Sequence, residues 1–106
     1  MKTFRVHPAA KAELAEEIDY YLNLGRFDKA DDFKAEMDRA QDLIQEHPTR
    51  WRLANPENYP TIRTYGPTKK FLYRIGYIEE ERFIYILAFY YSGEADPLDW
   101  TSRADD

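Results

Sequence analysis

The stretch that decides the fold covers residues 14–44, which read LAEEIDYYLNLGRFDKADDFKAEMDRAQDLI. Its first half carries apolar side chains at Leu14, Ile18 and Tyr21, which is the spacing of one helix face. Its second half repeats apolar residues at positions 27, 30, 33, 37, 40 and 44, with charged residues at most positions between them. Only Gly25 and Arg26 separate the two patterns, so the sequence predicts two antiparallel helices joined by a tight turn.

Prolines and a short alternating segment bound this pair of helices. Pro8 suits the first position of a helix, where its missing N–H is not needed, and Pro48 ends the second helix at or before His47. Residues 3–7 alternate apolar and polar side chains and predict a short strand before the first helix. Both histidines, His7 and His47, therefore flank helix ends, where we expect capping or dipole roles.

Downstream of residue 48 the hydrophobic period changes to that of strands. Residues 49–60 contain Pro56 and Pro60 and are expected to form a loop, with Trp51 and Leu53 turned inward. Strands are predicted at residues 61–65, 70–78 and 82–91, and the last is almost continuously apolar, as is typical of a central strand. Leu98 and Trp100 are expected to anchor the tail.

The order of elements is therefore β-α-α-β-β-β. It predicts a single α+β domain over residues 1–106, in which a helical hairpin packs on a small, mostly antiparallel sheet. We expect the first strand to pair beside the last ones, because so short a strand cannot stand alone.

Composition excludes several classes of protein. The absence of cysteine excludes disulfide frameworks, thiolate zinc sites and cysteine nucleophiles, and two histidines make a histidine metal centre improbable. We therefore expect no cofactor and no metal. No segment approaches the roughly 20 apolar residues of a membrane helix, and the first residues do not resemble an export signal. The expected location is the cytoplasm, with no membrane partner.

Charge is distributed unevenly along the chain. The 106 residues have a net charge of −5, but residues 50–74 form a basic island between two acidic segments. Such an island is a candidate surface for an anionic partner. The alternative is that these charges occupy solvated loop and strand-edge positions without a binding role. Its basic residues are Arg50, Arg52, Arg63, Lys69, Lys70 and Arg74, against a single acidic residue, Glu57.

The ordered set of residues over nearly the whole chain resembles the RelE/ParE superfamily of toxins from type II toxin–antitoxin systems, and is closer to the ParE branch. The residues that carry the resemblance are Val6-His7-Pro8-Ala9-Ala10, Leu14, Ile18-Asp19-Tyr20-Tyr21, Ala30, Phe33, Pro48, Ile62-Arg63, Tyr73-Arg74-Ile75-Gly76-Tyr77, Ile84-Tyr85-Ile86-Leu87-Ala88-Phe89 and Asp96-Pro97-Leu98-Asp99-Trp100-Thr101-Ser102-Arg103.

The resemblance implies a bacterial, plasmid- or chromosome-stabilising toxin that inhibits growth until a cognate antitoxin neutralises it. ParE-like members bind DNA gyrase and are not known as enzymes, whereas RelE-like members are ribosome-dependent endoribonucleases that cut mRNA. A third alternative is a detoxified relative that keeps only antitoxin binding. The family allows a homodimer or a heterotetramer with the antitoxin.

The candidate site follows from the strand arginines. Arg63 and Arg74 match arginine-bearing strands of the family and are the only catalytic candidates, because cleavage at a 2′-hydroxyl needs cations around the phosphate. The structural alternative is that both arginines form ion pairs with acidic residues of the helices. Apart from such pairs, we expect the acidic helix residues to be solvated. Tyr90 and Tyr91 either add an aromatic surface to this site, or one of them points into the core while the other covers the sheet. The full target-binding set is Arg52, Arg63, Lys69, Lys70, Arg74, Tyr90 and Tyr91.

The end of the last strand departs from the family pattern. The family usually carries a basic pair after this strand, whereas Ser92-Gly93-Glu94 stands here. This change removes cations that would hold a scissile phosphate, so it favours the gyrase-binding or detoxified alternatives over the ribonuclease.

Overall fold

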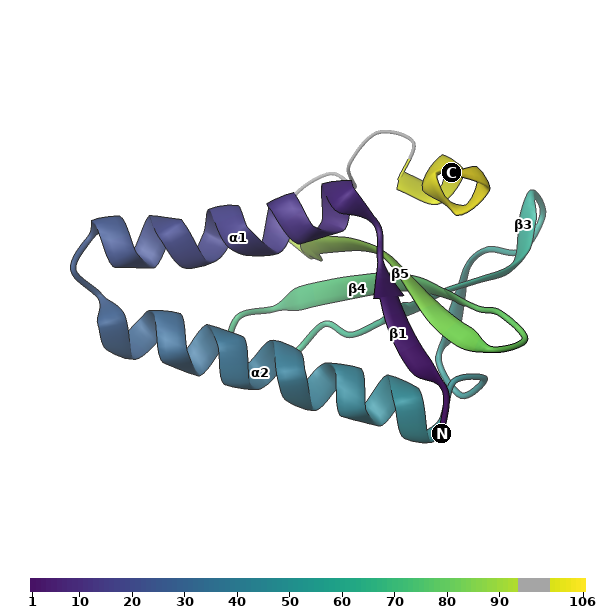
Figure 1. Cartoon of the computed structure of the whole chain (residues 1–106), viewed down its shortest axis with the longest axis horizontal. Helices are drawn as coiled ribbons and strands as arrows, with labels where there is room; N and C mark the ends of the chain where they lie inside the picture. The colour runs from purple at the N-terminus through teal and green to yellow at the C-terminus, as the bar shows by residue number, and fades with distance from the viewer. Residues whose placement is uncertain (94–99) are drawn as a thin grey trace.

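The structure is a computed structural model that describes residues 1–93 and 100–106. Figure 1 shows two long helices lying side by side against a twisted sheet, with a short helix near the C-terminus on the other side of the sheet. The elements are β1 (Thr3–Val6), α1 (Pro8–Asn23), α2 (Phe27–Glu46), β2 (Arg52–Asn55), β3 (Tyr59–Tyr65), β4 (Tyr73–Glu79), β5 (Phe83–Tyr91) and the 3-10 helix η1 (Trp100–Asp105).

The helical hairpin is confirmed, with boundaries set by local chemistry. α1 begins at Pro8, and Nδ1 of His7 caps it by accepting the backbone N–H of Ala9 at 3.0 Å. Gly25 takes the left-handed backbone conformation, φ 71°, that lets the chain turn into α2. Within the described residues, neither helix is long and apolar enough to cross a membrane.

One row of α2 faces the sheet, as its spacing predicts. Its fully buried members are Ala30, Phe33, Met37, Ala40 and Ile44. Phe27 is the exception: it belongs to the same row in sequence, but it lies at the tip of the hairpin and is 65% exposed. The row ends there because the sheet does not extend to the tip (Figure 1).

The sheet has the strand order β1-β5-β4-β3-β2 and is mixed. β1 pairs in parallel with β5, with Phe4 opposite Ile84, and the other neighbours are antiparallel. The expected pairing of the first strand beside the last is therefore confirmed. β5 is central, as predicted, because β1 and β4 flank it on either side.

The expectation for residues 49–60 is wrong in part. This segment is not a single loop: it contains β2 and the start of β3, so the order is β-α-α-β-β-β-β. The two prolines do not prevent pairing, because Pro56 lies in the turn between the strands and Pro60 precedes Ile62, where the ladder to β4 begins. Trp51 and Leu53 are half-buried, in agreement with the expectation.

The two faces of the sheet carry separate cores. Toward the helices, Ile75, Tyr77, Ile84 and Ile86 pack with the buried row of α2. On the opposite face, Trp100 of η1 packs with a second cluster formed by Ile62, Leu87, Ala88 and Tyr90. Trp100 is 4% exposed, so its predicted role as an anchor is confirmed, whereas Leu98 and Glu94 lie outside the described residues.

Candidate functional site

A basic pocket of about 310 Å³ opens at the end of the sheet where β2 begins and β3 turns into β4. Three arginines reach it from two segments: Arg50 and Arg52 from the segment at the start of β2, and Arg74 from β4. The lining residues are Arg50, Trp51, Arg52, Thr64, Tyr65, Gly66, Pro67 and Arg74. The pocket therefore combines part of the basic island of the sequence with the turn that follows β3.

Strand register places two of these arginines on one face. Arg52 pairs with Thr64, and Arg74 pairs with Tyr90. Paired residues project to the same side of a sheet, and the Thr64 and Tyr90 hydroxyls meet at 3.0 Å in the core under η1. Arg52 and Arg74 therefore share the face opposite the helical hairpin.

No carboxylate of the described residues neutralises the pocket arginines. The Arg74 guanidinium donates to the carbonyl of Gly66 at 3.1 Å, which fixes its position without cancelling its charge. The Arg50 guanidinium lies 5.1 Å from the centre of the Trp51 ring. Within residues 1–93 and 100–106, Arg50, Arg52 and Arg74 form no ion pair with a carboxylate. The pocket can therefore attract an anionic group.

Arg63 does not join this pocket. It pairs with Tyr77, so it projects toward the helices, and it donates to the carbonyl of Trp51 at 2.7 Å. The expectation that Arg63 and Arg74 face one surface is wrong, because the strand register places their side chains on opposite faces of the sheet. The alternative that Arg63 and Arg74 pair with acidic helix residues is also wrong, since each arginine donates to a backbone carbonyl instead.

The two lysines of the predicted set lie beside α2. The Lys70 ammonium is 2.6 Å from the Asp32 carboxylate, so its charge is paired. Glu36 accepts the backbone N–H groups of Lys70 and Phe71 at 3.0 and 2.7 Å, so this helix carboxylate holds a turn rather than only facing solvent. Lys69 is exposed and does not line the arginine pocket.

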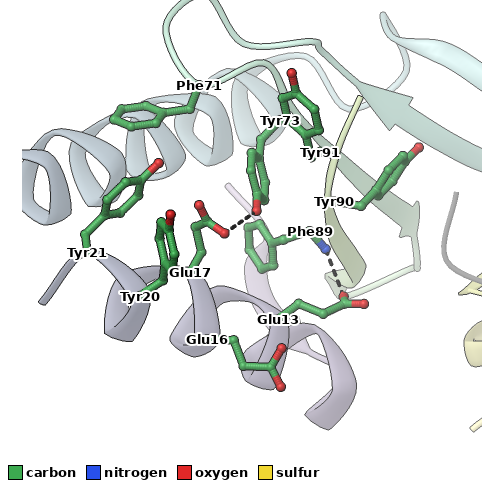
Figure 2. A pocket seen from close by; sticks show the side chains of 10 residues that line it. All are labelled: Glu13, Glu16, Glu17, Tyr20, Tyr21, Phe71, Tyr73, Phe89, Tyr90 and Tyr91. Atoms are coloured by element: carbon green, nitrogen blue, oxygen red, sulfur yellow. Dashed lines mark hydrogen bonds between the residues drawn. The ribbon is translucent and has the colours of Figure 1, made fainter. Parts of the chain in front are cut away.

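The two tyrosines of β5 divide between core and surface. Tyr90 is 6% exposed and contributes its hydroxyl to the buried contact with Thr64, whereas Tyr91 is 39% exposed. Tyr91 lines a second groove of about 490 Å³ beside α1, which Figure 2 shows from close by. That groove contains three glutamates and no basic residue among its lining side chains.

The described lining of the arginine pocket is cationic, aromatic and hydroxylic. Among residues 1–93 and 100–106, it includes no carboxylate and no imidazole. Burial raises the pKa of the Tyr65 phenol, so that side chain stays protonated. These side chains can bind and orient an anion.

Arg50, Trp51 and Thr64 were missed as members of the predicted site. Arg50 could have been found, because it belongs to the same basic island, but Trp51 and Thr64 enter only through the turn and the strand register. The Trp51 Nε1 atom is buried and has no hydrogen-bond partner among the residues that the structure describes.

Comparisons with known proteins agree with this architecture. Residues 4–95 match the family model described as the ParE toxin of type II toxin–antitoxin system, parDE. A solved structure titled "Chromosomal ParDE TA system from P. aeruginosa" superposes with a TM-score of 0.66 at 19% sequence identity, covering 84% of this chain and 94% of the other. No curated protein matches the sequence significantly.

Proposed function

The chain belongs to the ParE toxins of type II toxin–antitoxin systems, and from this premise we propose that it inhibits bacterial growth by binding DNA gyrase. The observation that carries the proposal is the arginine pocket, defined by Arg50, Arg52 and Arg74. Its charges are free of carboxylate partners in the described part of the chain and lie at an open end of the sheet. Such a pocket suits an acidic patch on a protein target.

The pocket favours binding over catalysis. Ribosome-dependent cleavage of mRNA, the alternative, requires a proton acceptor as well as cations. The lining residues that the structure describes supply three cations, and none of them is a carboxylate or an imidazole. The two residues that directly follow β5, Ser92 and Gly93, add no positive charge.

We further propose that a cognate antitoxin neutralises the toxin by covering this region. β2 is an edge strand of the described sheet, since β3 is its only partner among residues 1–93 and 100–106, and its outer side can accept an added strand. Arg52 lies on β2, so a strand added there would cover the arginine pocket. The groove beside the helical hairpin is the second proposed contact, and the assembly is either a homodimer or a heterotetramer with the antitoxin.

Survival of a bacterial host after induced expression tests the proposal. We expect wild type to reduce colony counts, and Arg52→Ala/Arg74→Ala to restore them. Lys34→Ala/Arg82→Ala is the matched control, because it removes two exposed positive charges outside the pocket. Equal killing by wild type and the pocket variant, at equal soluble protein, would place the toxic surface elsewhere.

Assays with purified protein separate the three alternatives. The proposal predicts inhibition of gyrase supercoiling by wild type and by the control variant, but not by the pocket variant. Cleavage of mRNA on ribosomes without an effect on supercoiling would instead support the ribonuclease. A folded wild type that affects neither process nor growth, yet binds its antitoxin, would support a detoxified relative.

A further inference from the structure

The groove beside α1 is chemically opposite to the arginine pocket. It runs between the C-terminal half of α1 and the neighbouring ends of β4 and β5 (Figure 2). Acidic and aromatic side chains form its whole lining. These residues are Glu13, Glu16, Glu17, Tyr20, Tyr21, Phe71, Tyr73, Phe89, Tyr90 and Tyr91.

Aromatic rings form the walls and the rim of this groove. The Tyr20 and Tyr21 rings meet edge to face at 5.4 Å, and Tyr73 lies 6.3 Å from Tyr91 between ring centres. Tyr20 is 57% exposed and Tyr91 is 39% exposed, so both present ring surface to solvent. Ring faces carry negative electrostatic potential and attract cations, arginine guanidinium above all.

The carboxylates come from a single face of α1. Glu16 and Glu17 lie three and four residues after Glu13, which places both of them one helical turn from it. Glu17 accepts a hydrogen bond from the Tyr73 hydroxyl at 2.8 Å. Burial raises the pKa of Tyr21, and the negative charge of Glu17 raises it further. Glu16 is exposed and has no hydrogen bond or ion pair to another described residue.

The fold already contains one guanidinium docked on this row. Arg103 of η1 bonds both oxygens of Glu13, at 3.0 and 3.2 Å, and also donates to the carbonyl of Leu87 at 2.9 Å. This contact neutralises Glu13 at one end of the groove. One helical turn further on, Glu16 and Glu17 present the same carboxylate chemistry beside the aromatic wall, without a cationic partner among the described residues.

The surface next to the groove suits a peptide rather than a small free cation. Leu72, between the lining residues Phe71 and Tyr73, is 42% exposed and has a φ of 59°, which is rare and strained for leucine. Such strain often accompanies functional surfaces. Together with Tyr20 and Tyr91, Leu72 provides exposed apolar area that a free cation would leave uncovered.

We propose that this groove binds a basic segment of a protein partner. An arginine side chain of that segment lies between Glu16, Glu17 and the tyrosine rings. Apolar residues on either side of this arginine pack on Leu72 and on the rim of the groove. The groove is also the second contact proposed for the antitoxin, so this inference rests on that proposal and adds the chemistry of the segment bound there. It does not depend on the growth-inhibiting target, because the described lining of the arginine pocket shares no residue with that of the groove. It also gives the strongly acidic α1 a specific use.

The test is an NMR and calorimetric titration of the full-length protein with a blocked heptapeptide, Ac-Ala-Leu-Ala-Arg-Ala-Leu-Ala-NH2. We expect shifts confined to the groove, and binding at least about tenfold weaker for the citrulline analogue, which keeps the shape and loses the charge. Glu16→Gln/Glu17→Gln should weaken binding by a similar factor. Tyr20→Leu should weaken it less, because it removes only one ring.

Two controls separate this site from general charge effects. Asp31→Asn/Asp38→Asn removes the same charge from exposed positions on α2 and should leave the affinity unchanged. Arg52→Ala/Arg74→Ala should also bind the peptide like wild type, whatever its effect on growth. The proposal is overturned if the peptide does not bind at about 5 mM, if the citrulline peptide binds equally, if the shifts map outside the groove, or if spermidine binds as tightly.

Discussion

The Trp100 ring lies directly against Gly76, so closely that a Cβ atom on Gly76 would stand 2.1 Å from Trp100 Cζ3. Gly76 lies in β4, inside the sheet, and Trp100 is the first residue of η1. The same ring packs beside Tyr90 with 5.6 Å between ring centres. A bare α-carbon therefore provides the space in which the C-terminal helix docks on the sheet.

Gly76→Ala is expected to lower the free energy of unfolding by about 2–3 kcal/mol, because the new methyl group overpacks the contact with Trp100. Urea unfolding measures the loss. Gly25→Ala is the matched control: nothing lies within 4 Å of its Cβ position, so only its positive φ should cost about 1 kcal/mol. The cost of Gly76→Ala should largely disappear in a Trp100→Ala background; an unchanged cost there would contradict this explanation.

His7→Ala is expected to cost about 1 kcal/mol, because the Nδ1 acceptor that caps α1 is lost. His7→Asn keeps a side-chain acceptor and should cost clearly less. The other ring nitrogen, Nε2, lies 2.7 Å from the Asp106 carboxylate, which is 64% exposed, so Asp106→Ala should cost under about 0.5 kcal/mol. Thermal unfolding of the three variants checks the order, and equal losses for His7→Ala and His7→Asn would exclude the cap.

The Arg103–Glu13 contact is expected to couple η1 to α1. Glu13 also accepts the backbone N–H of Phe89 at 3.1 Å, so Glu13→Ala leaves two donors unpaired and should cost about 2–3 kcal/mol. Arg103→Met removes the ion pair and the hydrogen bond to the Leu87 carbonyl but leaves the Phe89 N–H paired with Glu13, so it should cost less. A double-mutant cycle by urea unfolding should give a coupling of about 1 kcal/mol, and additive losses would show that the two side chains act separately.

Stability is expected to fall at alkaline pH. Burial raises the pKa values of Tyr21, Tyr65 and Tyr77, so these phenols stay protonated in the folded state after unfolded tyrosines begin to ionise near pH 10. The unfolded state then binds fewer protons, so the contribution of these phenols to the free energy of unfolding is fully present below about pH 10 and is lost progressively above it. Urea unfolding between pH 8.5 and pH 11 measures this dependence.

Tyr77→Phe distinguishes this cause from general alkaline damage. Tyr77 is fully buried and its hydroxyl donates to the Pro48 carbonyl at 2.7 Å, so the variant loses stability at every pH but should show a shallower decline. An identical slope in Tyr77→Phe would contradict the assignment.

The sequence by itself determined the helical hairpin and the central strand. The buried row of α2, from Ala30 to Ile44, follows from a period of 3.6 residues, and β5 follows from a run of apolar residues that only a doubly covered strand can bury. These are local properties, since each segment carries its own pattern of burial. The resemblance to ParE toxins added the family, which the match over residues 4–95 confirms.

The tertiary structure decided which charged residues act together. Arg63 and Arg74 are equivalent in the sequence, but strand register sends Arg63 toward the helices and Arg74 into the pocket with Arg50 and Arg52. β2 was hidden for the same reason, because a short edge strand is stabilised by its neighbour rather than by its own pattern. A shift of one residue exchanges the faces of a strand, so the surfaces of this toxin depend on pairing partners far away in the chain.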